Sequence, residues 1–172
     1  MSWYIGLMTG TVLDGNIDVA FLRTDGKTIE KFGYYDLVPY SEGVKSLIIS
    51  ALNEAKRWNF IGKEPEIFSK AEAALTKSQA EAVKKCIKLA GINKKEISAI
   101  GFHGQTVLHR PANRELKGAT RQLGDGQAMA NALDIPVVYD FRTHDIEKGG
   151  QGAPLCPCLL YTSDAADESR GV

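Results

Sequence analysis

The sequence has no excess of charge of either sign, no long apolar run and few cysteines. Its 172 residues include 21 basic and 21 acidic side chains, so the formal net charge is zero. This balance argues against the broad basic surface of a protein that binds nucleic acid or anionic membranes. No apolar run approaches the roughly 20 residues of a membrane-spanning helix, and the N-terminus does not resemble a signal peptide. We therefore expect a cytoplasmic protein that binds neither nucleic acid nor membranes.

The scarcity of cysteine excludes two further classes. Cys86, Cys156 and Cys158 are too few for a disulfide framework or a full set of zinc ligands. With 44% hydrophobic and 24% charged residues, the chain has the composition of one ordinary globular domain that can bury a sizeable core.

Three strand-like runs open the chain. Apolar residues alternate along residues 3–8 and 17–22, which is typical of half-buried strands. Asp25-Gly26 then separates the second run from a third at residues 28–35, and type I′ hairpin turns favour this dipeptide. The sequence therefore predicts an opening antiparallel β-meander.

Two amphipathic helices follow. Ser41 offers an N-cap for a helix up to Trp58, and Pro65 starts a second helix that ends at Gly91. Residues 97–102 are then expected to form a buried strand. Asp125 caps a brief helix up to Leu133, and residues 135–139 form a last buried strand, with a loop before that helix. This order predicts the α/β class.

The segment between the first two strands is rich in glycine, hydroxyl and carboxylate groups. Gly10 and Gly15 permit positive φ and close approach of a phosphate to backbone N–H groups, and Asp14 is a candidate to hold Mg²⁺ through water. The alternative is that these residues only make a turn. The candidate phosphate-binding residues are Gly10, Thr11, Val12, Leu13, Asp14, Gly15, Asn16 and Ile17.

Polar residues also follow the two late strands, where ligands collect in open α/β sheets. After residue 102, Gly104 provides a turn, and Gln105 and Thr106 supply neutral groups suited to sugar hydroxyls or phosphate. His103 fits this site or a core position bonded to backbone.

Asp140 and Arg142 follow the last strand. A carboxylate at the end of a buried strand is partly desolvated, which makes Asp140 the candidate general base, and Arg142 is a cation that can face a phosphate. Alternatively, Asp140 caps a turn or pairs with Arg142.

Four segments together resemble one family. Residues 8–18, 101–110, 122–125 and 138–155 occur in the order and spacing of the anhydro-N-acetylmuramic acid kinases. The resemblance spans about residues 3–157. It implies the N-terminal lobe of the actin-like, sugar-kinase and Hsp70 ATPase fold, which is ribonuclease H-like, with a mixed sheet.

The resemblance also implies a reaction that uses ATP and Mg²⁺. Water opens the 1,6-anhydro bridge of 1,6-anhydro-N-acetylmuramic acid while the freed O6 receives the γ-phosphate, giving N-acetylmuramate 6-phosphate in peptidoglycan recycling. Carried over, residues 10–17 would hold the ATP phosphates, and His103, Gly104, Gln105 and Thr106 would line the sugar. Asp140 would be the catalytic base, with Arg142 near the transferring phosphoryl group. The complete enzyme is expected to be a homodimer.

Two features depart from the family pattern. Val12 stands where many members have serine, and Asn16 is one extra residue, which leaves open whether Asp14 or Asp18 faces the metal. From Cys158 on, the sequence resembles a translated sequencing-library adapter, the alternative being a divergent tail.

We therefore expect residues 1–157 to be an incomplete N-terminal lobe and residues 158–172 to be a non-native tail. Without the second lobe, the chain alone is expected to be inactive. The alternative function is a non-catalytic actin-like nucleotide-binding module that uses ATP as a switch.

Overall fold

The computed structural model describes residues 1–9 and 14–153. These residues divide into two compact units. The first contains residues 1–108 and 121–140, and the second contains residues 109–120 and those from 141 onward. The candidate residues Gly10 to Leu13 and the tail from residue 158 lie outside the described residues.

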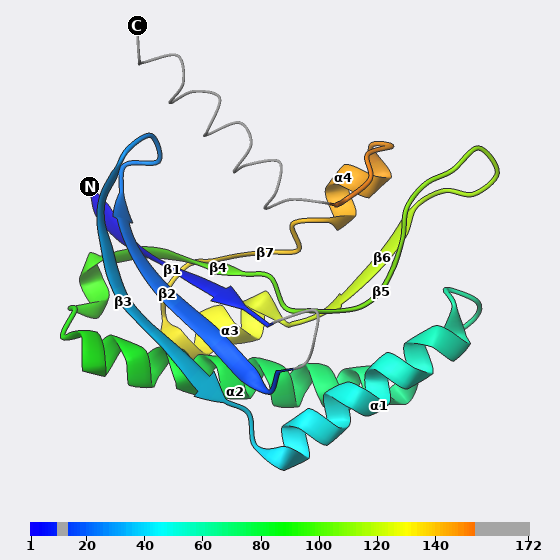
Figure 1. The fold of residues 1–172 in the computed structure, drawn as a ribbon, viewed down its shortest axis with the longest axis horizontal. Helices are drawn as coiled ribbons and strands as arrows, with labels where there is room; N and C mark the ends of the chain where they lie inside the picture. Colours follow the sequence, from blue (N-terminus) through cyan, green and yellow to red (C-terminus); the bar gives the residue numbers. More distant parts are fainter. Residues whose placement is uncertain (10–13, 154–172) are drawn as a thin grey trace, which may run out of the picture. The chain divides into compact units, whose positions relative to one another are not determined.

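A mixed five-stranded sheet forms the centre of the first unit. Its strands are β1 (Ser2–Met8), β2 (Asn16–Thr24), β3 (Ile29–Pro39), β4 (Ile97–Phe102) and β7 (Val137–Tyr139), in the order β3-β2-β1-β4-β7. β1, β2 and β3 pair antiparallel, while β4 is parallel to both β1 and β7 (Figure 1). The predicted α/β class and opening meander are confirmed.

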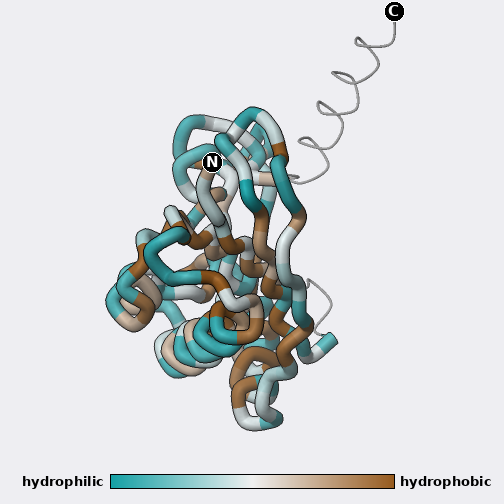
Figure 2. Tube along the Cα trace, turned by 90° about the vertical axis from the view of Figure 1, so that its left-hand side faces the viewer, coloured by the Kyte–Doolittle hydropathy of each residue, from teal (hydrophilic) through white to brown (hydrophobic). Residues whose placement is uncertain are grey.

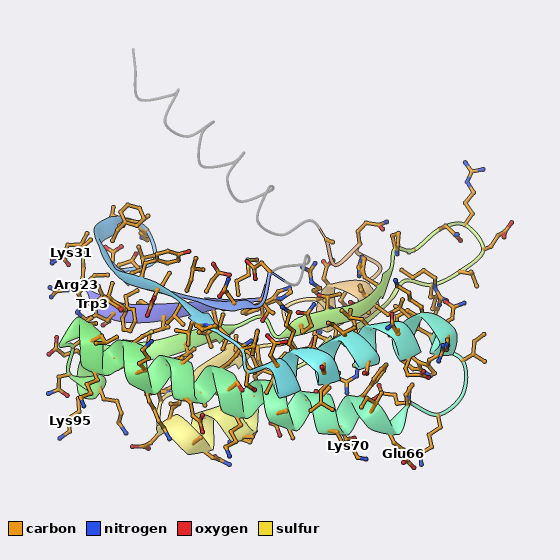
Figure 3. All side chains as sticks on the ribbon, turned by 60° about the horizontal axis from the view of Figure 1, so that its bottom comes forward. Trp3, Arg23, Lys31, Glu66, Lys70 and Lys95 are labelled. Atoms are coloured by element: carbon orange, nitrogen blue, oxygen red, sulfur yellow. The ribbon has the colours of Figure 1, made fainter. Side chains whose placement is uncertain are left out.

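Alternation along β1 and β2 gives the sheet one apolar face. Trp3, Ile5 and Leu7 are buried, whereas Tyr4 and Met8, on the other face of β1, are exposed. Helices α2 (Glu66–Ala90) and α3 (Gly126–Leu133) pack on the apolar face (Figures 1 and 3).

Helix α1 (Glu42–Trp58) packs along α2 and shares a second apolar cluster with it. This cluster also holds Val107 and Leu123, which come from two strands after β4. Figure 2 shows hydrophobic residues recurring along the strands and helices, whereas the turns are largely hydrophilic. The core of the first unit therefore consists of two apolar clusters, both of which include residues of α2.

Local signals set the helix ends where the sequence places them. Ser41 Oγ accepts a hydrogen bond from the Val44 N–H, and Asp125 Oδ1 accepts one from the Ala128 N–H at 2.8 Å. Gly91 ends α2 in the left-handed conformation, as expected of a C-cap glycine. No helix among residues 1–9 and 14–153 combines the length and apolar character needed to cross a membrane.

Two predictions in the second half of the chain were wrong. The expected loop after residue 102 contains a two-stranded ribbon, in which β5 (Gln105–Arg110) pairs with β6 (Ala119–Leu123). Earlier in the chain, a 3-10 turn, η1 (Lys94–Glu96), comes directly before β4. The last strand, β7, covers three residues and is largely exposed, because it is an edge strand. A short helix, α4 (Thr143–Glu147), follows it in the second unit.

Candidate active site

Three chain segments leave the sheet at the edge formed by the carboxyl ends of β1, β4 and β7. The register aligns Leu7 of β1 with Phe102 of β4, and Phe102 with Tyr139 of β7. Because these strands are parallel, the residues that follow each of them emerge side by side. Thr9, His103 and Asp140 therefore begin three neighbouring connections.

The first connection joins β1 to β2 and is anchored at its described ends. Met8 pairs with Asp18, and the Tyr40 N–H donates to the Gly15 carbonyl oxygen at 2.8 Å. Asp14 is exposed and its Oδ1 accepts from the Asn16 N–H at 2.9 Å. Ile17 is buried in the core and pairs with Val38 of β3, so its side chain is not exposed to a phosphate.

A buried polar cluster supports this connection from below. Gln79 Nε2, from the middle of α2, donates to Thr9 Oγ1 at 2.7 Å and to Tyr40 Oη at 2.6 Å. The Thr9 and Tyr40 hydroxyl oxygens are 3.1 Å apart. Burial raises the pKa of Tyr40, so its hydroxyl stays neutral. Sequence reasoning missed this cluster, because the three residues lie far apart in the chain.

A lysine missed by sequence reasoning also lies beside this connection. The Nζ of Lys45, in the first turns of α1, would be 3.4 Å from a Cβ placed on Gly15. No carboxylate in the described part of the chain lies within 4 Å of this ammonium in an ion pair. Lys45 therefore brings a positive charge to Gly15, within the candidate phosphate-binding segment.

The four predicted sugar-binding residues divide between two environments. Gln105 is only 2% exposed and lies on the same face of β5 as the buried Val107. Thr106 faces the other side, where its Oγ1 is 3.4 Å from Gln122 Nε2. His103 is half-buried, with Nδ1 2.9 Å from the Gly104 carbonyl oxygen. The structure thus leaves His103 and Thr106 accessible, whereas Gln105 supports the strand from inside.

Two glycines bring residues 103–106 and 122–125 together. Gly104 has φ +68°, and a Cβ there would collide with the Leu123 carbonyl oxygen. A Cβ on Gly124 would lie 2.7 Å from Phe102 Cζ and 3.2 Å from the Gly104 Cα. Contact this close requires that both positions lack a side chain.

Helix α2 holds the turn between β6 and α3. Glu72 Oε1 accepts from the Gly124 N–H, and Thr76 Oγ1 accepts from the Asp125 N–H, both at 3.0 Å. Arg121 bonds both Glu72 and Glu64. Burial alone would lower the pKa of Arg121, but the hydrogen bonds and charges of the two glutamates outweigh it and raise this pKa. The Gly-Asp-Gly turn is therefore fixed, with Asp125 engaged as a helix cap.

Asp140 lies directly after β7 in a left-handed conformation with φ +54°. The ring of Tyr139 packs on Gly126, where a Cβ would collide with it, and this contact fixes the residue before Asp140. The expectation of a partly desolvated carboxylate was wrong, because Asp140 is exposed at the end of an edge strand. A non-glycine residue with positive φ is uncommon, and such strain is often found at functional sites.

Arg142 belongs to the second unit. Its guanidinium donates to the Gly152 carbonyl oxygen, and burial lowers its pKa, although arginine keeps its charge in proteins. Burial first, and then the charge of Arg142, lower the pKa of His109 in the same unit. The Gly152 N–H donates to Asp145 Oδ2 at 2.7 Å. The glycine-rich segment therefore folds back onto α4.

Comparison with known proteins assigns the family. The model of the family described as anhydro-N-acetylmuramic acid kinase matches residues 2–170. The chain belongs to the anhydro-N-acetylmuramic acid kinase family. Curated relatives of that name come from Brucella anthropi, at 53% identity over 95% of this chain, and Mesorhizobium japonicum, at 54% over 96%. The chain spans 45% and 46% of their lengths, respectively. Because the match runs past Pro157, the origin of residues 158–172 stays a prediction.

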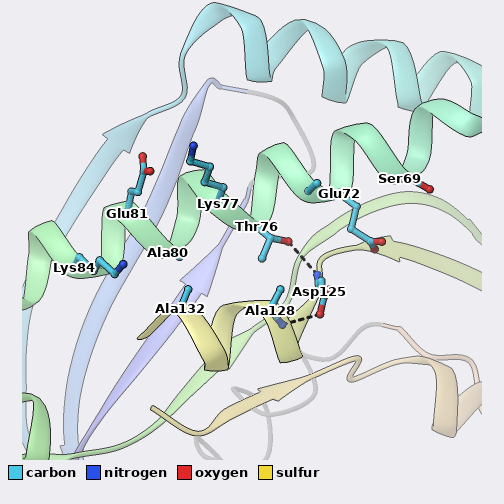
Figure 4. A pocket seen from close by; sticks show the side chains of 11 residues that line it. Ser69, Glu72, Thr76, Lys77, Ala80, Glu81, Lys84, Asp125, Ala128 and Ala132 are labelled. Atoms are coloured by element: carbon cyan, nitrogen blue, oxygen red, sulfur yellow. Dashed lines mark hydrogen bonds between the residues drawn. The ribbon is translucent and has the colours of Figure 1, made fainter. Parts of the chain in front are cut away.

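The first unit has a groove away from the sheet edge. A groove of about 480 Å³ runs between α2 and α3 (Figure 4). Its lining mixes alanines with Lys77, Glu81 and Lys84, and it includes none of the residues that the family resemblance places in the kinase site. We therefore place the candidate active site of this kinase-family chain at the sheet edge.

The contact at Gly104 predicts a large effect of a single methyl group. Gly104→Ala should destabilise the chain by about 2–5 kcal/mol, combining about 1–2 kcal/mol for the left-handed backbone with about 1–3 kcal/mol for overpacking. Gly91→Ala is the matched control, since Gly91 has φ +66° and open space around it. Urea unfolding of the two variants measures the difference, and equal losses would contradict the close contact.

The neighbourhood of His109 predicts a charge effect on its titration. Arg142→Gln should raise the pKa of His109 toward 6.5, without reaching it because burial persists. Arg114→Gln, at the tip of the same β5–β6 ribbon, should leave that pKa unchanged. An NMR titration of the His109 ring measures this, and an unchanged pKa in Arg142→Gln would refute the contribution of Arg142.

The same shift fixes a pH dependence of stability. The folded state holds the proton of His109 less tightly than the unfolded state does. Its contribution to stability is therefore lost as the pH falls through 6.5 and levels off below the lower folded pKa.

Proposed function

We propose that the complete protein is an ATP-dependent kinase of 1,6-anhydro-N-acetylmuramic acid, acting in peptidoglycan recycling. The observation that carries this proposal is the shared edge of β1, β4 and β7. In this register Thr9, His103 and Asp140 begin neighbouring connections, in a chain that belongs to this kinase family. The proposal concerns the complete protein, since the chain spans less than half of its curated relatives.

Asp140 is proposed to act as the general base. It takes a proton from the water whose oxygen bonds to C1 of the sugar as the C1–O6 bond breaks. O6 then bonds to the γ-phosphorus as the bond from that phosphorus to ADP breaks, which gives N-acetylmuramate 6-phosphate. Exposure of Asp140 suits this role, because the carboxylate must reach a substrate-bound water. Arg142 is proposed to lie near the transferring phosphoryl group.

The nucleotide phosphates are proposed to bind along residues 10–17, with the charge of Lys45 beside them. Magnesium usually keeps several waters and binds one or two carboxylates plus phosphates, so Asp14 and Asp18 fit it without a larger cluster. Indeed, no three His, Cys, Asp or Glu side chains of the described residues gather as a metal site. When bound, Mg²⁺ would neutralise phosphate charge.

Sugar contacts are proposed from His103, Gly104 and Thr106, with Gln105 holding the strand behind them. The actin-like, sugar-kinase fold group is proposed for the complete protein, because the opening meander and parallel β4 and β7 suit its N-terminal lobe. Because its reaction needs ATP, the complete protein is proposed to act in the cytoplasm. It is also proposed to be a homodimer.

Asp140→Asn in the complete protein should lower sugar-dependent ADP formation at least about a hundredfold, because the amide cannot accept the proton. Asparagine tolerates the left-handed backbone, so the fold should persist. Asp134→Asn is the matched control. Asp134 also has positive φ, but it lies at the end of α3 and pairs with Lys94. A coupled ADP assay with the anhydrosugar measures both variants.

Two outcomes would overturn the proposal. If Asp140→Asn keeps most of its activity, Asp140 is not the base. If the complete wild-type protein binds ATP but forms no phosphorylated sugar, it is a nucleotide-dependent switch module rather than a kinase.

A further inference from the structure

Tyr40 contacts the residue before the candidate phosphate-binding segment, residues 10–17, and a residue within it. Its side-chain hydroxyl lies 3.1 Å from Thr9 Oγ1, immediately before that segment. Its backbone N–H donates to the Gly15 carbonyl oxygen at 2.8 Å, in the second half of that segment. One residue at the end of β3 therefore ties together the two points between which residues 10–14 must run.

Gln79 fixes the side chain of Tyr40. Its amide Nε2 donates to both hydroxyl oxygens, at 2.7 Å to Thr9 and 2.6 Å to Tyr40. With both hydroxyls accepting from Gln79, one of them donates to the other and closes a three-membered ring of hydrogen bonds. The ring joins three elements, because Thr9 follows β1, Tyr40 follows β3 and Gln79 lies in α2.

Burying the polar groups of this ring carries a desolvation cost. Thr9, Tyr40 and Gln79 are 5%, 6% and 1% exposed, and Gln79 Oε1 has no hydrogen-bond partner among the described residues. Apolar side chains of similar shape often fill such positions at no loss of stability. Stability alone therefore does not require a polar ring here, and its hydrogen bonds converge on Thr9 and on Tyr40, which also holds Gly15.

We propose that Tyr40 is a positioning residue for nucleotide binding, oriented by Gln79, that holds Thr9 and Gly15 at the spacing required for phosphate contacts. The inference rests on the proposed function, in which this segment binds the phosphates of ATP. Holding these two residues before the ligand arrives lowers the ordering cost of binding. Removing the Tyr40 hydroxyl should therefore weaken nucleotide binding while leaving the sugar site intact.

The test uses the complete protein and measures MgADP affinity by calorimetry, together with KM for ATP and for the anhydrosugar. Tyr40→Phe should weaken MgADP binding and raise KM for ATP about 3–10-fold, the loss typical of one hydrogen bond. The sugar KM should change less than about twofold. Tyr34→Phe is the matched control, because Tyr34 lies in β3, the strand that Tyr40 follows, and its hydroxyl bonds Asp36 instead. Tyr34→Phe should change neither the affinity for MgADP nor the KM for ATP.

Thr9 provides a second pair of variants. Thr9→Val removes the hydroxyl at constant shape and should reproduce the effect of Tyr40→Phe, whereas Thr9→Ser keeps the hydroxyl and should retain near-normal nucleotide affinity. Thermal melts identify any variant that fails to fold.

The positioning role is refuted if Tyr40→Phe and Thr9→Val fold and bind MgADP as the wild type does. It is also refuted if the two variants raise the KM for the sugar as much as they weaken nucleotide binding, since equal losses indicate a general structural effect. A wild type that binds MgADP but does not phosphorylate the sugar overturns the proposed function alone, and the calorimetry still decides the role of Tyr40. Wild-type protein that binds no nucleotide overturns both.

Discussion

The parallel pairing of β4 with β1 and β7 is the constraint on which the candidate site depends. Its register places Leu7, Phe102 and Tyr139 in one row, so the connections that follow them share one edge. A slip of one residue would turn Phe102 from the helix layer to the open face and move His103 with it. The apolar face of the sheet, packed on α2 and α3, prevents this slip.

Side chains of helix α2 support the turns at that edge. Glu72, Thr76 and Gln79 recur at the spacing of one helix face. Each bonds a different turn: Glu72 the N–H of Gly124, Thr76 the N–H of Asp125, and Gln79 the hydroxyls of Thr9 and Tyr40. The helix that carries much of the core therefore also holds the turns in place, and couples them to folding.

Features set by local signals could be predicted from the sequence. The caps at Ser41 and Asp125, the C-cap at Gly91 and the Asp25-Gly26 hairpin depend on neighbouring residues, and the structure confirms them, although Asp25 lacks the positive φ of a type I′ turn. The family resemblance, carried by four short segments, is confirmed by the match over residues 2–170.

Features that depend on distant residues could not be predicted. The β5–β6 ribbon is fixed by the contact between Gly104 and Leu123, and the support of Thr9 comes from a glutamine 70 positions away. Lys45 looks like an ordinary surface residue of α1 until Gly15 is seen beside it. The exposure of Asp140 follows from the edge position of β7, which the apolar run at residues 135–139 does not reveal.

A crystal structure of the complete protein with MgADP and 1,6-anhydro-N-acetylmuramic acid tests the central claim most directly. The account predicts the phosphates along residues 10–17 and the anomeric carbon of the sugar facing Asp140. Nucleotide bound in the groove between α2 and α3, or a sugar bound away from Asp140, would contradict it.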